Sequence, residues 1–289
     1  FMEKFLIKGS SSKGVKGLIS CSGAKNAVLP LMASSILFDN TVILKNVPLG
    51  ANDVQTMIIL LKSLGSKVQI FKKKKILTIT NKKKHKLLVK YKYISTMRAG
   101  VLAMGALLGK YNKCSTALSG GCSLGPRPIG YHLAGFRRLN CNYSLNKGYI
   151  NILARNGIKG GHYHFPKVSV TGTSNLILAS VLANGTTTLK NISIEPEVLD
   201  LIKFLKNGGA KIYSVGKRAI KIYGVKKLNG HLHEVIGDRI EAFSYLCAAA
   251  ITKGKIKIDK INPKHLATEL EILKNIGCNI KIGKSSIEL

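Results

Sequence analysis

The feature that most constrains the fold is an internal repetition. Four segments end in a similar phrase, in which an apolar stretch is followed by Gly or Asn and then by strand-forming residues: LLKSLGSKVQI, GFRRLNCNYSL, FLKNGGAKIYS and ILKNIGCNIKI. When Gly65, Asn140, Gly209 and Gly277 are aligned, the offsets are 75, 69 and 68 residues. A unit of this length is too long for a common solenoid repeat, so it predicts a pseudo-symmetric domain built from several units around a core.

The first, third and fourth repeats share one order of elements. An apolar helix leads to a strand (TVILKNV, TTTLKNI and KIKIDKI), a second amphipathic helix follows, and a pair of strands ends the unit. In the first repeat, apolar residues recur at helical spacing at Val54, Met57, Ile58, Leu61 and Leu64, whereas KILTIT alternates as a half-buried strand does. Gly at the end of the second helix favours a left-handed cap. The sequence therefore predicts an α/β fold of repeated helix, strand, helix and hairpin units.

Composition places the chain among globular proteins. Its 289 residues, 45% of them hydrophobic, provide material for one large core or two ordinary ones. The longest apolar stretches, 101–108 and 245–251, are shorter than the roughly 20 residues of a membrane-spanning helix, and the first residues do not resemble a signal peptide. We therefore expect a cytoplasmic protein without a membrane partner. The six cysteines show no metal-ligand spacing, so we expect most of them to be buried thiols.

The net charge of +33 at first suggests a protein that binds nucleic acid. However, the lysines are spread along the whole chain, only 6% of residues are aromatic, and Trp is absent. The densest basic run, residues 71–86, is predicted to be a hairpin with a solvated lysine-rich turn. Binding of nucleic acid is therefore the least favoured function, although a basic surface attracts nucleotides and phosphates.

Two segments carry side chains suited to chemistry. In CSGAKNAVLP, Lys25 and Asn26 open a predicted helix, where an ammonium beside free N–H groups makes an anion site; the alternative is a simple cap with a solvated lysine. In SGGCSLGPRPIGYH, glycines and prolines predict a shaped loop that contains Cys122 and Arg127. A neighbouring guanidinium lowers the pKa of a thiol, so Cys122 is suited to act as an acid or nucleophile. The alternative is a surface turn with an incidental cysteine.

Three weaker candidates join charge or hydroxyl groups to the start of a predicted helix. They are Arg98 in STMRAG, the segment KVSVTGTSN at 167–175, and GDRIEA at 237–242. Each of them, taken alone, is more typical of a helix cap than of a binding site.

Taken in order, the motifs SGAKNAVLP, TMRAG, GGCSLGPRP, KVSVTGTSN, EPEVLDL and GDRIEA resemble those of the enolpyruvyl transferase family. The cysteine loop resembles that of members acting on UDP-N-acetylglucosamine rather than on shikimate phosphate. The resemblance implies an inside-out α/β barrel fold with two domains of three repeats. Residues 25–236 would form one complete domain, and residues 1–24 with 237–289 would form part of the second, with one repeat of three. We therefore expect a truncated chain, or one whose remaining half lies on another chain.

The reaction implied by this resemblance is transfer of the enolpyruvyl group of phosphoenolpyruvate to the 3-hydroxyl of UDP-N-acetylglucosamine with release of phosphate. This is the first committed step of peptidoglycan synthesis and implies neither a metal nor an organic cofactor. Cys122 would be the general acid and the target of fosfomycin, Lys25 and Arg127 would hold phosphoenolpyruvate, and Asn26 would orient the sugar. The residues implied to bind the UDP moiety are Arg98, Arg127, Pro128, Ile129, Gly130, Tyr131, Lys167, Val168, Ser169 and Val170.

Two other functions stay open at this stage. The chain could be a truncated, non-catalytic binder of nucleotide sugars, or a basic protein that binds nucleic acid and keeps an old fold. Binding of DNA or RNA whose affinity falls steeply with salt concentration would distinguish the nucleic-acid-binding protein.

Overall fold

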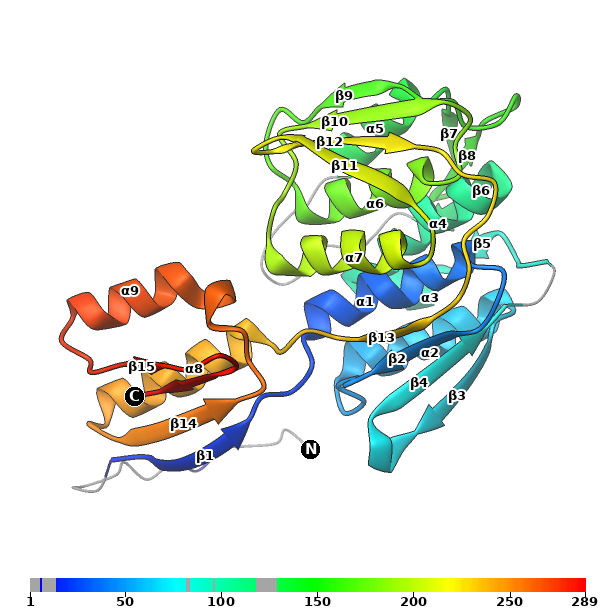
Figure 1. Cartoon of the computed structure of the whole chain (residues 1–289). Coiled ribbons are helices and arrows are strands. Elements are labelled where there is room, and N and C mark those ends of the chain that lie inside the picture. Colours follow the sequence, from blue (N-terminus) through cyan, green and yellow to red (C-terminus); the bar gives the residue numbers. More distant parts are fainter. Residues whose placement is uncertain (1–5, 7–13, 82–83, 96, 118–128) are drawn as a thin grey trace. The chain divides into compact units, whose positions relative to one another are not determined.

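The computed structural model describes residues 6, 14–81, 84–95, 97–117 and 129–289 (Figure 1). The chain divides into two compact units. The larger unit is Lys25–Val235, and the smaller unit combines the described part of residues 1–24 with Ile236–Leu289.

The larger unit contains three successive α/β repeats, and the smaller unit contains a fourth. In the first repeat the elements are α1 (Lys25–Ser34), β2 (Val42–Lys45), α2 (Asn52–Leu64), β3 (Lys67–Phe71) and β4 (Ile76–Thr80). In the second they are α4 (Leu102–Tyr111), β6 (Lys113–Ala117), α5 (Gly130–Arg138), β7 (Asn142–Asn146) and β8 (Tyr149–Leu153). In the third they are α6 (Val170–Ser180), β10 (Thr186–Lys190), α7 (Pro196–Asn207), β11 (Lys211–Gly216) and β12 (Ala219–Tyr223). In the fourth they are α8 (Arg239–Ile251), β14 (Lys255–Asp259), α9 (Ala267–Asn275), β15 (Lys281–Ile282) and β16 (Ser286–Glu288).

The prediction of helix, strand, helix and hairpin is confirmed, and it extends to the second repeat. There, the short helices α3 (Tyr91–Ile94) and η3 (Arg98–Val101) precede α4. The remaining short helices are η1 (Ser35–Leu37), η2 (Lys72–Lys74) and η4 (Pro263–Leu266).

Each repeat contributes three strands to a sheet of four. The strand after the apolar helix pairs antiparallel with the last strand of the hairpin, which pairs antiparallel with the strand before it. A fourth strand then pairs in parallel at the edge. These edge strands are β1 (Lys16–Ser20), β5 (Leu88–Val89), β9 (His162–His164) and β13 (Leu232–Glu234).

The edge strands show an exchange between the first and fourth repeats. In the second and third repeats, β5 and β9 pair with the strand that follows the next apolar helix, namely β6 and β10. By the same rule β1 would pair with β2, and β13 with β14. Instead β1 pairs with β14, and β13 pairs with β2. Strand β1 thus precedes the first repeat in the sequence but completes the sheet of the fourth. Strand β13 precedes the fourth repeat but completes the sheet of the first.

The apolar helices form the interior of the larger unit, and its sheets lie outside them (Figure 1). Helices α1, α4 and α6 contact one another through α4, and seven successive residues of α4, Leu102–Leu108, are buried. Burial on all sides explains why these helices are apolar around their circumference. Among the described residues the four sheets stay separate, and none closes into a barrel.

The predicted left-handed caps are present in all four repeats. The aligned residues Gly65, Asn140, Gly209 and Gly277 have φ values of 116°, 64°, 105° and 96°. Gly adopts this region without steric cost, and Asn adopts it more readily than most side chains, which explains the choice of residues at this position.

The predicted lysine-rich hairpin is present, but its bounds differ from the predicted 71–86. Strands β3 and β4 form it over residues 67–80, and the lysines of its turn, Lys72–Lys74, are exposed as expected. Cys21, Cys114 and Cys141 are buried free thiols, whereas Cys247 and Cys278 are half-buried. Within the described ranges, we find no helix with the length and apolar character needed to cross a membrane.

Candidate functional site

The predicted site residues that the structure describes lie at the N-termini of four helical elements. Lys25 and Asn26 begin α1, and Arg98 begins η3. Ile129 precedes α5, which opens with Gly130 and Tyr131. Lys167, Val168 and Ser169 lead into α6, which opens with Val170. Unpaired N–H groups and the helix dipole both favour anions at such positions.

Lys25 forms an ion pair with Asp53 of α2. Its Nζ atom lies 2.9 Å from a carboxylate oxygen of Asp53, and the two side chains are 43% and 32% exposed. The ion pair thus orients the Lys25 side chain at the start of α1. Asn26, the next residue, is exposed.

A buried network joins three of the four N-terminal segments. The Asn175 amide of α6 lies 2.8 Å from His132 Nδ1 of α5 and donates to the Val101 carbonyl of η3 at 3.0 Å. The same amide accepts a hydrogen bond from Gly105 N of α4 at 2.9 Å. His132 Nε2 also lies 3.4 Å from Thr171 Oγ1, in the first turn of α6. The network therefore holds the starts of η3–α4, α5 and α6 together.

The start of α6 combines a cap with exposed neighbours. Ser169 accepts a hydrogen bond from Gly172 N at 3.2 Å, so the cap reading of KVSVTGTSN is correct. Lys167, Val168 and Val170 are exposed around this cap. The segment can therefore offer main-chain donors, an ammonium and an apolar surface to a ligand at the same place.

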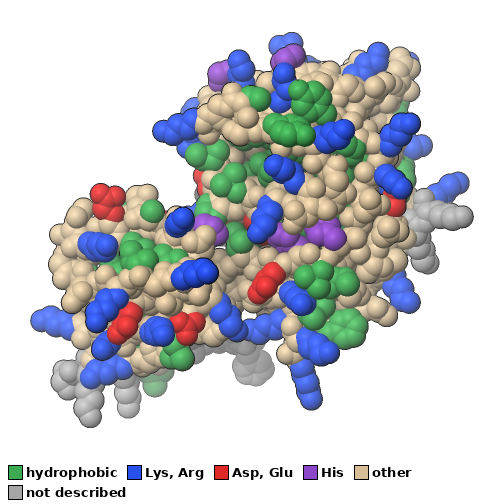
Figure 2. Space-filling view, in the orientation of Figure 1, with side chains coloured by type: hydrophobic (Ala, Val, Ile, Leu, Met, Phe, Trp, Pro, Cys, Tyr) green, Lys and Arg blue, Asp and Glu red, His purple; other side chains and the backbone are tan. Residues whose placement is uncertain are grey.

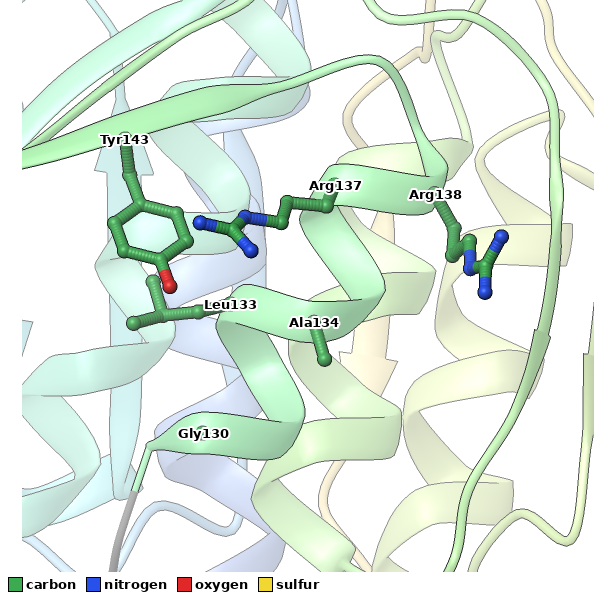
Figure 3. Close-up of a pocket in the computed structure, with 6 residues that line it drawn as sticks. All are labelled: Gly130, Leu133, Ala134, Arg137, Arg138 and Tyr143. Carbon is green, nitrogen blue, oxygen red and sulfur yellow. The ribbon is translucent and has the colours of Figure 1, made fainter.

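An open groove of about 440 Å³ runs along α5 from Gly130 (Figure 3). Its other lining residues are Leu133, Ala134, Arg137, Arg138 and Tyr143. The Arg137 guanidinium lies over the Tyr143 ring at 4.5 Å from the ring centre, whereas Arg138 points to the other side of the helix. Of the predicted site residues that the structure describes, only Gly130 lines this groove.

Of the predicted chemical centre, the structure describes Lys25 alone. Cys122, Arg127 and Pro128 lie outside the described residues, and of Arg98 only the main chain is described. Their roles remain predictions.

GDRIEA, in the smaller unit, forms a helix cap. Asp238 accepts hydrogen bonds from Ile240 N at 2.9 Å and Glu241 N at 3.2 Å, which fits the cap reading. The Glu241 carboxylate accepts from Ser22 N at 2.8 Å. Burial, and then the charge of Glu241, raises the pKa of Cys21 to about 12, so this thiol is a poor nucleophile.

Sequence reasoning missed three residues that shape the candidate site. Asp53 is a first-turn acidic residue that sequence alone does not connect with Lys25. His132 and Asn175 were included only as the ends of two motifs, and their contact joins positions 43 residues apart. Asn175 precedes the apolar run LILA of α6, and a polar residue at that place is the signal that could have drawn attention to it, whereas the mixed sequence of α5 gives no such signal for His132.

Comparison with known proteins now identifies the family. The model of the EPSP synthase (3-phosphoshikimate 1-carboxyvinyltransferase) family matches residues 10–289. The chain belongs to this family of enolpyruvyl transferases, which confirms the resemblance seen in its motifs.

Curated relatives match this chain over almost its whole length. The UDP-N-acetylglucosamine 1-carboxyvinyltransferase of Pelagibacter ubique is 44% identical over 286 residues, which are 99% of this chain and 67% of that protein. The enzyme of the same name from Coxiella burnetii (strain Dugway 5J108-111) is 40% identical over 288 residues, or 100% of this chain and 65% of that protein. This chain thus spans about two thirds of the length of these relatives.

Solved structures show the same fold at low sequence identity. The enolpyruvyl transferase NikO from Streptomyces tendae superimposes with a TM-score of 0.84 at 16% identity, over 96% of this chain and 66% of NikO. An EPSP synthase from Acinetobacter baumannii superimposes with a TM-score of 0.74 at 19% identity, over 96% of this chain and 65% of that protein.

Proposed function

We propose that this chain carries part or all of an enolpyruvyl transferase that moves the enolpyruvyl group of phosphoenolpyruvate to the 3-hydroxyl of UDP-N-acetylglucosamine and releases phosphate. The observation that carries the proposal is the network of His132 and Asn175, which joins α5 and α6, just after the predicted residues 129–131 and 167–170, to each other and to η3 and α4. Helix N-termini held in this way suit the diphosphate of a nucleotide sugar. The names of the relatives at 40–44% identity point to the same substrates.

The proposed roles are those that the family resemblance implies, and the positive charges of Lys25 and Arg127 suit the two anionic groups of phosphoenolpyruvate. Lys25 and Arg127 hold the phosphate and carboxylate of phosphoenolpyruvate, and Cys122 is the general acid that protonates its methylene carbon. Asn26 orients the sugar. Arg98, residues 127–131 and residues 167–170 bind the UDP moiety.

Two further points belong to the proposal. We infer that residues 25–236 form a complete three-repeat domain, and that residues 1–24 with 237–289 contribute one repeat to a second domain. We also infer a cytoplasmic location, because both proposed substrates are soluble metabolites of the cell interior.

The experiment measures phosphate release from phosphoenolpyruvate in the presence of UDP-N-acetylglucosamine. The polypeptide is compared with Cys122→Ala, and each is also tested for binding of UDP-N-acetylglucosamine by calorimetry. We expect phosphate release that requires both Cys122 and the nucleotide sugar. Saturable binding of the nucleotide sugar without any release would support the non-catalytic binder instead. A folded chain that neither releases phosphate nor binds the nucleotide sugar would refute the proposal.

A further inference from the structure

A second pocket lies in the larger unit at the edge of the third sheet. It has a volume of about 420 Å³ and is lined by Arg138, His162, Tyr163, His164, Thr188 and Lys190. None of these residues is among the predicted site residues. The pocket lies where the end of α5 meets the strands β9 and β10.

The register of the sheet explains how the side chains gather. Strands β9 and β10 are parallel, with His162 beside Thr188 and His164 beside Lys190. Side chains of paired residues point to the same face of a sheet, so these four share one face. Figure 2 shows histidine and basic side chains together on the surface over β9 and β10.

The described residues of the lining are basic or neutral, and none of them carries a carboxylate. Arg138 and Lys190 are cations, and each imidazole offers an N–H donor in any protonation state. In the part of the chain that the structure describes, no ion pair involves Arg138 or Lys190. The charge of the pocket is therefore not neutralised by its surroundings.

Two hydroxyl groups in the lining have no partner among the described residues. Thr188 is only 7% exposed, and its Oγ1 atom makes no hydrogen bond. The hydroxyl of Tyr163, which is likewise shielded from solvent, also makes none. Of these two hydroxyl groups, that of Thr188 lies on the face of the sheet shared with His162, His164 and Lys190, so a ligand in the pocket that accepts from it would supply the missing partner.

We propose that this pocket binds a small phosphorylated anion at a site separate from the predicted substrate residues. Arg138 and Lys190 supply the positive charge, and the side chains of His162, His164 and Thr188, which share one face of the sheet with Lys190, donate hydrogen bonds. A phosphate or diphosphate group fits this set, because its several oxygens accept from many donors at once and match the fork of a guanidinium.

The test uses inorganic pyrophosphate as the probe and histidine resonances as the reporter. The chain contains seven histidines, so ring resonances can be resolved and assigned with His162→Gln and His164→Gln. Pyrophosphate is titrated into the full chain while the shifts of all histidines are followed. We expect saturable shifts of His162 and His164 that follow a single binding curve.

Variants separate a built site from diffuse attraction to a basic protein. Arg138→Gln combined with Lys190→Gln should weaken pyrophosphate binding roughly tenfold or more, because two charge-assisted contacts are lost. The matched control, Lys73→Gln with Lys74→Gln, removes the same charge from the exposed turn of the β3–β4 hairpin and should change the affinity less than twofold. Thr188→Val removes a hydroxyl at nearly constant volume and should weaken binding a few-fold.

The possible outcomes distinguish this site from the proposed substrate site. Binding at the proposed substrate site would move the His132 resonance on a separate curve, and Lys190→Gln alone, at a residue that does not line the groove along α5, should leave that curve unchanged. The proposal is overturned if the shifts of His162 and His164 do not saturate, or if both charge variants weaken binding equally. It is also overturned if only His132 responds. Loss of phosphate release by Cys122→Ala bears on the proposed function alone.

Discussion

Replacement of Asn175 by Ala tests the network that joins the helix N-termini. Asn175 is fully buried and shares hydrogen bonds with Gly105 N, the Val101 carbonyl and His132. Each such bond contributes about 1 kcal/mol net, and each buried partner left without a bond costs more. We therefore expect Asn175→Ala to lower the free energy of unfolding by about 3 kcal/mol. This is a large part of the 5–15 kcal/mol typical of a domain.

The assay is urea unfolding followed by far-UV circular dichroism. With a slope near 3 kcal/mol per molar, the expected loss moves the midpoint of the larger unit by about 1 M. The matched control is Ser174→Ala, at the next position of α6. Ser174 is also buried but makes one hydrogen bond, to the Val170 carbonyl at 3.1 Å, so its loss should cost about 1 kcal/mol or less. If Asn175→Ala lowers stability no more than Ser174→Ala does, the network does not hold the helices together.

Three further predictions concern packing, pH and thiol chemistry. Gly105→Ala should destabilise the chain by about 2 kcal/mol or more in the same urea assay, because the new Cβ atom would meet the main chain of Asn175. Burial and then the charge of Lys110 lower the pKa of His85, so its contribution to stability is full above about pH 6.5 and is lost as pH falls below it. When the pH is lowered from about 7.5 to 5, the urea midpoint of the His85→Gln variant should therefore fall less than that of the unaltered chain. Burial raises the pKa of Cys141 to about 12, so iodoacetamide at neutral pH should modify it only after unfolding, as mass spectrometry of digests can show.

The repeat could be found in the sequence because its signals are local. A Gly or Asn at a left-handed cap and an alternating strand depend on neighbouring residues only, and both were predicted correctly at Gly65 and Gly209. The second repeat was harder to see because α3 and η3 interrupt the approach to its apolar helix.

The exchange of edge strands could not be predicted in the same way. Strands β1 and β13 each precede an apolar helix, as β5 and β9 do, so a local pattern gives them the same partner rule. Their actual pairing depends on which sheet edge each strand reaches in space. Short strands carry little register information of their own.

The candidate site shows the same division between local and distant signals. The motifs predicted two helix starts correctly, because Lys25 opens α1 and Ser169 caps α6, and both positions depend on neighbouring residues only. The contacts of His132 with Asn175, and the gathering of Arg138, Thr188 and Lys190 in one pocket, join residues from different repeats or strands. No periodicity encodes such contacts, and packing alone determines them.

The last prediction separates a structural role of the Lys25–Asp53 pair from a functional one. Both side chains are partly exposed, at 43% and 32%, and such pairs contribute about 0–1 kcal/mol, so Asp53→Asn should leave the urea midpoint almost unchanged. If Lys25 holds phosphoenolpyruvate as proposed, loss of the carboxylate that orients it should lower kcat/KM for phosphoenolpyruvate roughly tenfold, mainly through KM.

The matched control is Asp39→Asn, which makes the same change of charge in the pair with Lys110, another partly exposed ion pair of the larger unit. This variant should retain nearly the full kcat/KM, because no predicted site residue takes part in that pair. Equal losses in the two variants would mean that the general field of the protein, rather than the orientation of Lys25, sets the affinity for phosphoenolpyruvate. A gain in Asp53→Asn alone would mean that Asp53 competes with the substrate for the ammonium instead of positioning it.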